Sequence, residues 1–111
     1  MAPHPTHLLA PVPEAVRPDK LILVNANDRA VPNSAAWVNG LFMECYDTST
    51  AATWTRIETT MRWAETNLLP PRANCLEFWF HSSRNDLNLM RAVTTLSLTR
   101  SDGYCLFSDP N

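Results

Sequence analysis

The chain has 111 residues, a length typical of one domain, and its formal net charge is −2. This charge provides no electrostatic attraction for nucleic acid or for an anionic membrane surface, so both are disfavoured as partners. Hydrophobic residues make up 45% of the sequence, which is typical of a globular domain and not of a disordered chain.

The sequence predicts an intracellular protein in a reducing compartment. The longest apolar runs, such as LILV at 21–24, are far shorter than the roughly 20 residues that a membrane span needs. Proline interrupts the N-terminal segment, which therefore lacks the apolar stretch of a secretory signal. Three cysteines, Cys45, Cys75 and Cys105, cannot all pair within the chain, so we expect reduced thiols and no membrane span.

Residues 1–18 are predicted to form an extended arm, and residues 19–111 an α+β domain. Five of the nine prolines lie in the arm, where they favour extended or polyproline II backbone. The arm is apolar, so we expect it to lie against a surface; a small domain has little surface to spare, which favours a neighbouring chain. The alternative is that the arm folds back over its own domain. The arm residues predicted to contact a partner are Pro3, Pro5, Leu8, Leu9, Pro11 and Pro13.

After the arm, a strand is predicted at 20–25, because the aliphatic run KLILVN is followed by turn-forming residues. A helix is predicted over 34–46, where large apolar residues recur at helical spacing. This stripe consists of Trp37, Val38, Leu41, Phe42 and Cys45. A second helix is predicted over 49–68, with two prolines directly beyond its end. Its core stripe consists of Trp54, Ile57, Met61, Ala64 and Leu68.

Trp63 interrupts the pattern of the second helix. It lies nine positions after Trp54, so helical geometry predicts that it projects from roughly the opposite face. Tryptophan is enriched at the energetic centres of protein interfaces. We therefore predict that Trp63, with Arg56 and Thr59 beside it, contacts a partner chain.

Residues 74–81, NCLEFWFH, alternate as a strand. One face carries Leu76, Phe78 and Phe80. The other face is mixed, and its large apolar residue, Trp79, is a further predicted partner contact. The mixed face comprises Cys75, Glu77, Trp79 and His81.

Residues 86–108 have two interpretations. The preferred one is a short helix at 86–92 followed by a β-hairpin that joins 94–100 to 104–108 through Asp102-Gly103, a strong turn signal. β-Branched residues from Val93 onwards support it, because they weaken a helix. The competing interpretation is one longer helix through Leu98. The predicted fold is therefore a small single α+β domain, with two helices packed on a small, mostly antiparallel sheet and an extended Pro-rich arm.

The sequence predicts no metal, no cofactor and no catalytic residues. His4 and His7 form the only closely spaced pair of metal-ligand type, and C-x-x-C and H-E-x-x-H motifs are absent. With two glycines in the chain there is no glycine-rich phosphate loop. Cys75 and His81 share a strand face, but six residues separate them by about 20 Å.

These observations favour a non-enzymatic accessory or structural subunit of a larger assembly. Its predicted partners are other protein chains, in a homo- or hetero-oligomer, and it binds them through the arm and exposed tryptophans. One alternative is a small enzyme or ligand-binding domain that uses Cys75, His81 or Cys105. Another is a single-stranded nucleic-acid binder that stacks bases on the sheet aromatics Phe78 and Phe80.

Overall fold

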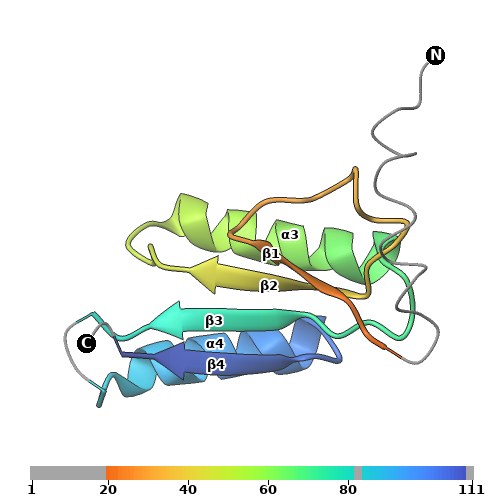
Figure 1. The fold of residues 1–111 in the computed structure, drawn as a ribbon. Coiled ribbons are helices and arrows are strands. Elements are labelled where there is room, and N and C mark those ends of the chain that lie inside the picture. Colours follow the sequence, from red (N-terminus) through yellow and green to blue (C-terminus); the bar gives the residue numbers. More distant parts are fainter. Residues whose placement is uncertain (1–19, 82–83, 110–111) are drawn as a thin grey trace.

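A computed structural model describes residues 20–81 and 84–109 (Figure 1). The predicted arm therefore lies outside the described residues. The described part of the chain contains four strands and two helices. In chain order they are β1 (Leu23–Ala26), β2 (Gly40–Cys45), α3 (Ala51–Asn67), β3 (Cys75–Trp79), α4 (Leu87–Arg100) and β4 (Tyr104–Ser108).

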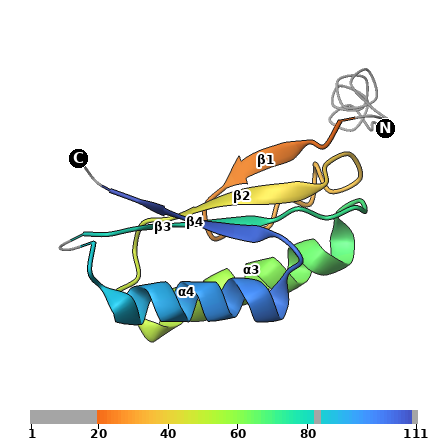
Figure 2. The same cartoon turned by 90° about the horizontal axis from the view of Figure 1, so that it is seen from below.

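The four strands form one sheet in the order β1-β2-β3-β4, and every neighbouring pair is parallel. The prediction of a mostly antiparallel sheet is therefore wrong. Figure 2 shows α3 and α4 side by side on one face of the sheet. Parallel crossovers are almost always right-handed, so strands added in one direction place all their helices on the same face.

The predicted helix over 34–46 is also wrong. Residues 32–37 form turns, and 40–45 form strand β2. Leu41, Met43 and Cys45 are buried at alternate positions, as in a strand with one face on the core. A Cβ at Gly40 would lie 2.2 Å from the Ala73 carbonyl oxygen, so this strand position requires glycine for close backbone approach.

The predicted hairpin at 94–108 is wrong, and the longer-helix interpretation is correct. Helix α4 runs to Arg100, and its first turn is capped by Asp86, whose side chain accepts a hydrogen bond from the Leu89 N–H. Val93 and Ser97 are buried, so tertiary packing outweighs the weak helix propensity of the threonines beside them. The turn at Asp102-Gly103 then leads from α4 into β4.

For the remaining elements, the type of secondary structure was predicted correctly. The helix expected over 49–68 is α3, whose cap, Thr50, accepts a hydrogen bond from the Thr53 N–H. The strands expected at 20–25 and 74–81 are β1 and β3 with shifted ends. The core lies between the sheet and the two helices. Its buried cluster comprises Val38, Leu41, Met43, Cys45, Ile57, Met61, Ala64, Leu68, Leu76, Phe78 and Val93.

Candidate functional site

The most unusual surface is the face of the sheet that points away from the helices, here called the open face. Among the described residues no helix lies on this side (Figure 2). Parallel sheets are usually covered on both faces. Because side chains alternate along each strand, the open-face residues follow from the core positions and the register. They are Leu23, Asn25, Gly40, Phe42, Glu44, Cys75, Glu77, Trp79, Tyr104, Leu106 and Ser108.

All four strands place apolar side chains on the open face. Tyr104 and Leu106, on edge strand β4, expose 44% and 42% of their surface. Leu23, Phe42 and Trp79 are half-buried on the other three strands. Contiguous apolar patches on soluble domains mark interaction surfaces. The open face is therefore the strongest candidate for a docking surface on the described part of the chain.

Two carboxylates lie within this face, between the row that contains Phe42 and Tyr104 and the more distal Trp79. Glu44 and Glu77 are directly opposite each other on β2 and β3, an arrangement that like charges make unfavourable. Each carboxylate receives a hydrogen bond from an outer strand. Asn25 Nδ2 donates to Glu44 Oε1 at 2.8 Å, and Ser108 Oγ donates to Glu77 Oε2 at 2.5 Å. Both carboxylates are thus held in place, and they put an acidic pair within the open face.

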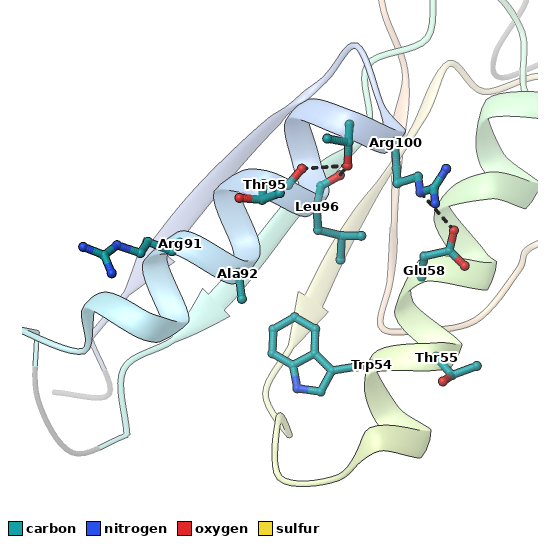
Figure 3. Close-up of a pocket in the computed structure, with 9 residues that line it drawn as sticks. Trp54, Thr55, Glu58, Arg91, Ala92, Thr95, Leu96 and Arg100 are labelled. Atoms are coloured by element: carbon teal, nitrogen blue, oxygen red, sulfur yellow. Dashed lines mark hydrogen bonds and ion pairs between the residues drawn. The ribbon is translucent and has the colours of Figure 1, made fainter.

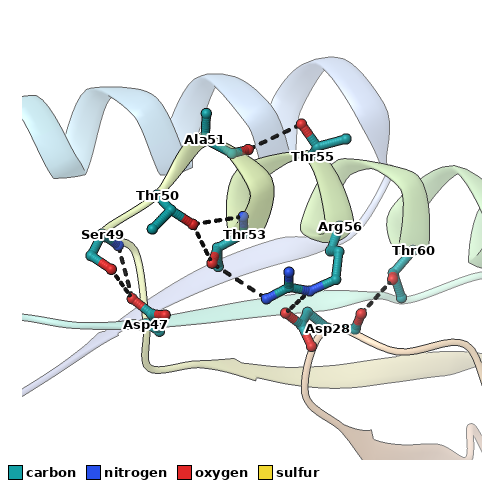
Figure 4. Close-up of polar contacts among 9 residues, drawn as sticks. All are labelled: Asp28, Asp47, Ser49, Thr50, Ala51, Thr53, Thr55, Arg56 and Thr60. Atoms are coloured by element: carbon teal, nitrogen blue, oxygen red, sulfur yellow. Dashed lines mark hydrogen bonds and ion pairs between the residues drawn. The ribbon is translucent and has the colours of Figure 1, made fainter.

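A cavity of about 270 Å³ lies beyond the carboxyl ends of β1 and β2, next to Asn27, Asp28 and Asp47. Figure 4 shows the polar contacts of two residues that line it, Asp28 and Asp47. Arg56 Nε donates to Asp28 Oδ2 at 3.0 Å, and Thr60 Oγ1 donates to the Asp28 carbonyl at 2.8 Å. These contacts attach the β1–β2 loop to α3, so we assign them a structural role.

Asp47, in the same region, titrates at lower pH than usual. Hydrogen bonds from the side chain and backbone N–H of Ser49 lower the pKa of this carboxyl, because they favour its charged form. Both bonds go to Oδ1, at 2.6 and 2.9 Å. The carboxylate thus stabilises the turn that leads into α3.

A larger cavity, of about 670 Å³, lies between α3 and α4 on the outer side of the helical layer (Figure 3). Trp54 and Leu96 provide its apolar floor, and Arg91, Glu58 and Arg100 lie at its margin. Glu58 and Arg100 form an ion pair of 3.2 Å that bridges the two helices. Exposed pairs of this kind contribute little to stability.

Trp79 lies on the open face as the strand alternation predicted, and its ring centroid is 6.0 Å from that of Tyr46. The expected position of Trp63 is wrong, because this residue is half-buried and packs against the core cluster. Arg56 is engaged by Asp28, and Thr59 is exposed beside it on α3. Their roles as partner contacts stay predictions, as do those of the arm residues, which lie outside the described part of the chain.

All three cysteines are free, and the two buried ones, Cys45 and Cys75, are poorly suited to nucleophilic chemistry. Burial raises the pKa of Cys45 to about 12 and that of Cys75 to about 11, so both remain thiols near neutral pH. His81 Nε2 lies 2.5 Å from the carbonyl oxygen of Tyr46, whereas Cys75 begins β3 at the opposite end. Cys75 and His81 thus lie at opposite ends of β3, as the strand spacing predicted. In residues 20–81 and 84–109, no cluster of three or more metal-ligand side chains occurs.

The aromatic residues proposed to stack nucleic-acid bases are in the core. Phe78 is fully buried and stacks on Trp54, with ring centroids 5.3 Å apart. Phe80 is buried and stacks on Phe107 at 5.4 Å. Neither ring is accessible to a base, so this face offers no stacking platform.

Sequence reasoning missed Tyr104 and Leu106 as surface residues. The segment YCLFS was predicted as a strand, and its alternation does separate these two residues from Cys105 and Phe107. Both sets are equally apolar, however, so alternation alone does not show which set faces the core. That depends on which side of the sheet the helices occupy.

Comparison of the chain with protein-family models, with curated proteins and with solved structures finds no match. Within the described residues, neither helix has the length and apolarity that crossing a membrane requires. Inferences about function therefore depend on the geometry of the chain alone.

Proposed function

We propose that this protein is a non-enzymatic interaction subunit that binds another protein chain through the open face of its sheet. One observation carries this proposal: a parallel four-stranded sheet has helices on one face, and its second face, which no helix of the described residues covers, carries apolar side chains on all four strands. Covering that face removes apolar side chains from water on all four strands, which is the main favourable term in protein association.

The composition of the open face supports binding of a protein. Trp79, Tyr104 and Phe42 place three aromatic rings on neighbouring strands, and aromatic residues dominate the energetics of interfaces. The adjacent carboxylates Glu44 and Glu77 lie within the face and favour a partner that brings hydrogen-bond donors or cations to that position.

The proposal is tested by replacing one open-face residue and one matched residue elsewhere. Leu106→Glu puts a charge on the open face, and Leu98→Glu puts the same charge on α4, where the leucine is 75% exposed. The wild-type protein and both variants are purified with an affinity tag from the source cells, and bound chains are quantified by mass spectrometry. Circular dichroism checks that all three are folded.

We expect one or more chains to be retained by the wild type and by Leu98→Glu, and to be lost at least tenfold with Leu106→Glu. A buried, unpaired charge at the interface accounts for this loss. Equal retention by the two variants would show that the open face is not the docking surface. If nothing is retained by the wild type, the proposed interaction does not exist under these conditions.

A further inference from the structure

We infer that two copies of this chain pair through the edge of the sheet at β4, about a twofold axis. This inference goes beyond the proposed function, because it uses a different surface and its occupant is a second copy. The edge has two layers, which are β4 itself and the flank of α4 that points away from α3. Among the described residues no strand pairs with the outer side of β4, which is the last strand in the sheet order (Figure 1).

Exposed apolar side chains concentrate at this edge. Six large hydrophobic residues of the described part of the chain are exposed, and four of them lie on α4 or β4. The remaining two lie outside the helices and strands. The four at the edge are Leu87 (56% exposed), Leu98 (75%), Tyr104 (44%) and Leu106 (42%).

The two leucines of α4 lie on the flank that overhangs β4. Helix α3 packs over β2, and α4 packs over β3 and β4, so the side of α4 opposite α3 faces outward past the edge strand (Figure 2). Ala92 and Leu96 line the groove toward α3. At 3.6 residues per turn, Leu87 and Leu98 point roughly 120–180° away from them. Thr94 lies between these leucines, along a shallow depression of about 330 Å³.

The backbone of β4 has a row of hydrogen-bonding groups that β3 does not use. The Tyr104 N–H donates to the Asn74 carbonyl at 3.0 Å, and the Ser108 carbonyl accepts a bond on the same side, at 2.9 Å. Backbone groups alternate in direction along a strand, so the N–H and C=O groups of Cys105 and Phe107 point away from β3. An outward row of this kind is a template for another strand.

An antiparallel second copy satisfies these groups about a twofold axis at Leu106. Cys105 of each copy then exchanges both of its backbone hydrogen bonds with Phe107 of the other copy. Leu106 lies opposite its own counterpart in a non-hydrogen-bonded pair, where side chains are closest. The same axis places the two α4 flanks side by side and antiparallel, on one side of a continuous sheet made of both copies.

The edge lacks the features that protect edge strands from pairing. β4 contains no charged residue and no proline, and its register with β3 is continuous. Two copies therefore meet without like charges opposed across the strand pair. The edge measures roughly 20 by 20 Å over both layers, or about half of the 800 Å² that each partner of a standard interface buries. We therefore expect a reversible dimer with a dissociation constant in the micromolar range.

Sedimentation velocity of the free, full-length protein tests the dimer. The wild type is compared with Leu98→Glu and Leu21→Glu from about 1 μM to about 0.5 mM, and circular dichroism checks that all three are folded. Leu98→Glu puts a charge on the α4 flank. Leu21→Glu is the matched control, because it puts the same charge on an exposed leucine (53%) next to β1, at the opposite edge of the sheet.

We expect the wild type and Leu21→Glu to dimerise with dissociation constants within about twofold of each other. Leu98→Glu should dimerise at least about tenfold more weakly, because its charge is buried at the interface. A wild type that stays monomeric over the whole range, or equal dimerisation by the two variants, would overturn the inference.

Disulfide crosslinking tests the position of the axis. Leu106→Cys places a thiol opposite its own counterpart, so mild oxidation should link two chains on a non-reducing gel. Tyr104→Cys is the matched control, because it has nearly the same exposure but lies opposite Ser108 of the other copy. The wild type, with its three free cysteines, supplies the background.

We expect at least about fivefold more linked dimer for Leu106→Cys than for Tyr104→Cys, since a disulfide needs closely placed Cβ atoms. An equal mixture of Tyr104→Cys and Ser108→Cys should restore the link. Equal crosslinking of Leu106→Cys and Tyr104→Cys, or none above background, would overturn the pairing of β4 with itself.

These outcomes are distinct from partner capture by the open face. Leu98→Glu leaves that face intact, so it should lose the dimer and still retain the captured chains. A dimer that forms as expected while no other chain is captured would support the inference and contradict the proposed function. Captured chains together with a monomeric wild type would support the proposed function and contradict the inference.

Discussion

Asn39 organises the amino end of the sheet, and its replacement by alanine is the most direct test of the fold. This side chain is fully buried just before β2. Its Oδ1 accepts a hydrogen bond from the Ile22 N–H at 3.0 Å, ahead of β1. Its Nδ2 donates to the carbonyls of Leu69 and Pro71, at 3.3 and 3.2 Å, in the connection from α3 to β3. One amide group thus holds together three segments of the chain.

The expected cost of Asn39→Ala follows from these three bonds. Each hydrogen bond contributes about 1 kcal/mol net, and backbone groups left without a partner in a buried site add to the loss. We therefore expect the free energy of unfolding to fall by about 3 kcal/mol, a large share of the 5–15 kcal/mol typical of a domain. Urea denaturation followed by circular dichroism measures this change as a shift in midpoint at nearly constant slope.

Asn25→Ala is the matched control. Asn25 also donates from its side-chain amide, to Glu44, but this bond is exposed to solvent. We expect a loss below about 0.5 kcal/mol there, because water replaces the lost partner. A loss below 1 kcal/mol for Asn39→Ala, or equal losses for the two variants, would refute the assignment of Asn39 as the tie between these segments.

Three further predictions concern the cysteines and Trp63. In the folded protein at pH 8, a disulfide reagent should modify Cys105 first, and it should modify Cys45 and Cys75 at least tenfold more slowly. All three cysteines should react after denaturation. Fast modification of Cys45 in the folded protein would contradict its burial. Burial raises the pKa of the Cys45 thiol from 9.0 to about 12. The stability that this protonated thiol contributes is therefore fully present below pH 9 and is lost as pH rises toward 12. Trp63→Ala should lower the free energy of unfolding by about 2 kcal/mol, since the ring packs against the core. An unchanged unfolding midpoint would instead place Trp63 on the surface, as the helical spacing alone suggested.

The elements that the sequence determined have strong local signals. Helix α3 combines a capping residue, Thr50, a stripe at helical spacing and the prolines that follow it, and all of these act within one stretch of chain. Strand β3 was recognised because its alternation is clear, and Trp79 was correctly placed on the face opposite Phe78. Such signals involve neighbours in sequence, so they can be interpreted without knowing the fold.

The identity of β2 was decided by tertiary structure. Val38, Leu41, Phe42 and Cys45 recur at helical spacing, while Leu41, Met43 and Cys45 also alternate as in a strand. Pairing with β1 on one side and β3 on the other selects the strand, because both ladders satisfy backbone groups that a buried segment cannot leave unpaired. Those partners are distant in sequence, so the local pattern did not contain this information.

The same reason explains why the candidate site was only partly predicted. The choice between a hairpin and helix α4 set the direction of β4, and the parallel direction places both helices on one face. Only then do Tyr104 and Leu106 become surface residues while Cys105 and Phe107 turn toward the core. The sequence determined which residues alternate along a strand, and the tertiary structure decided which side of the sheet was left uncovered.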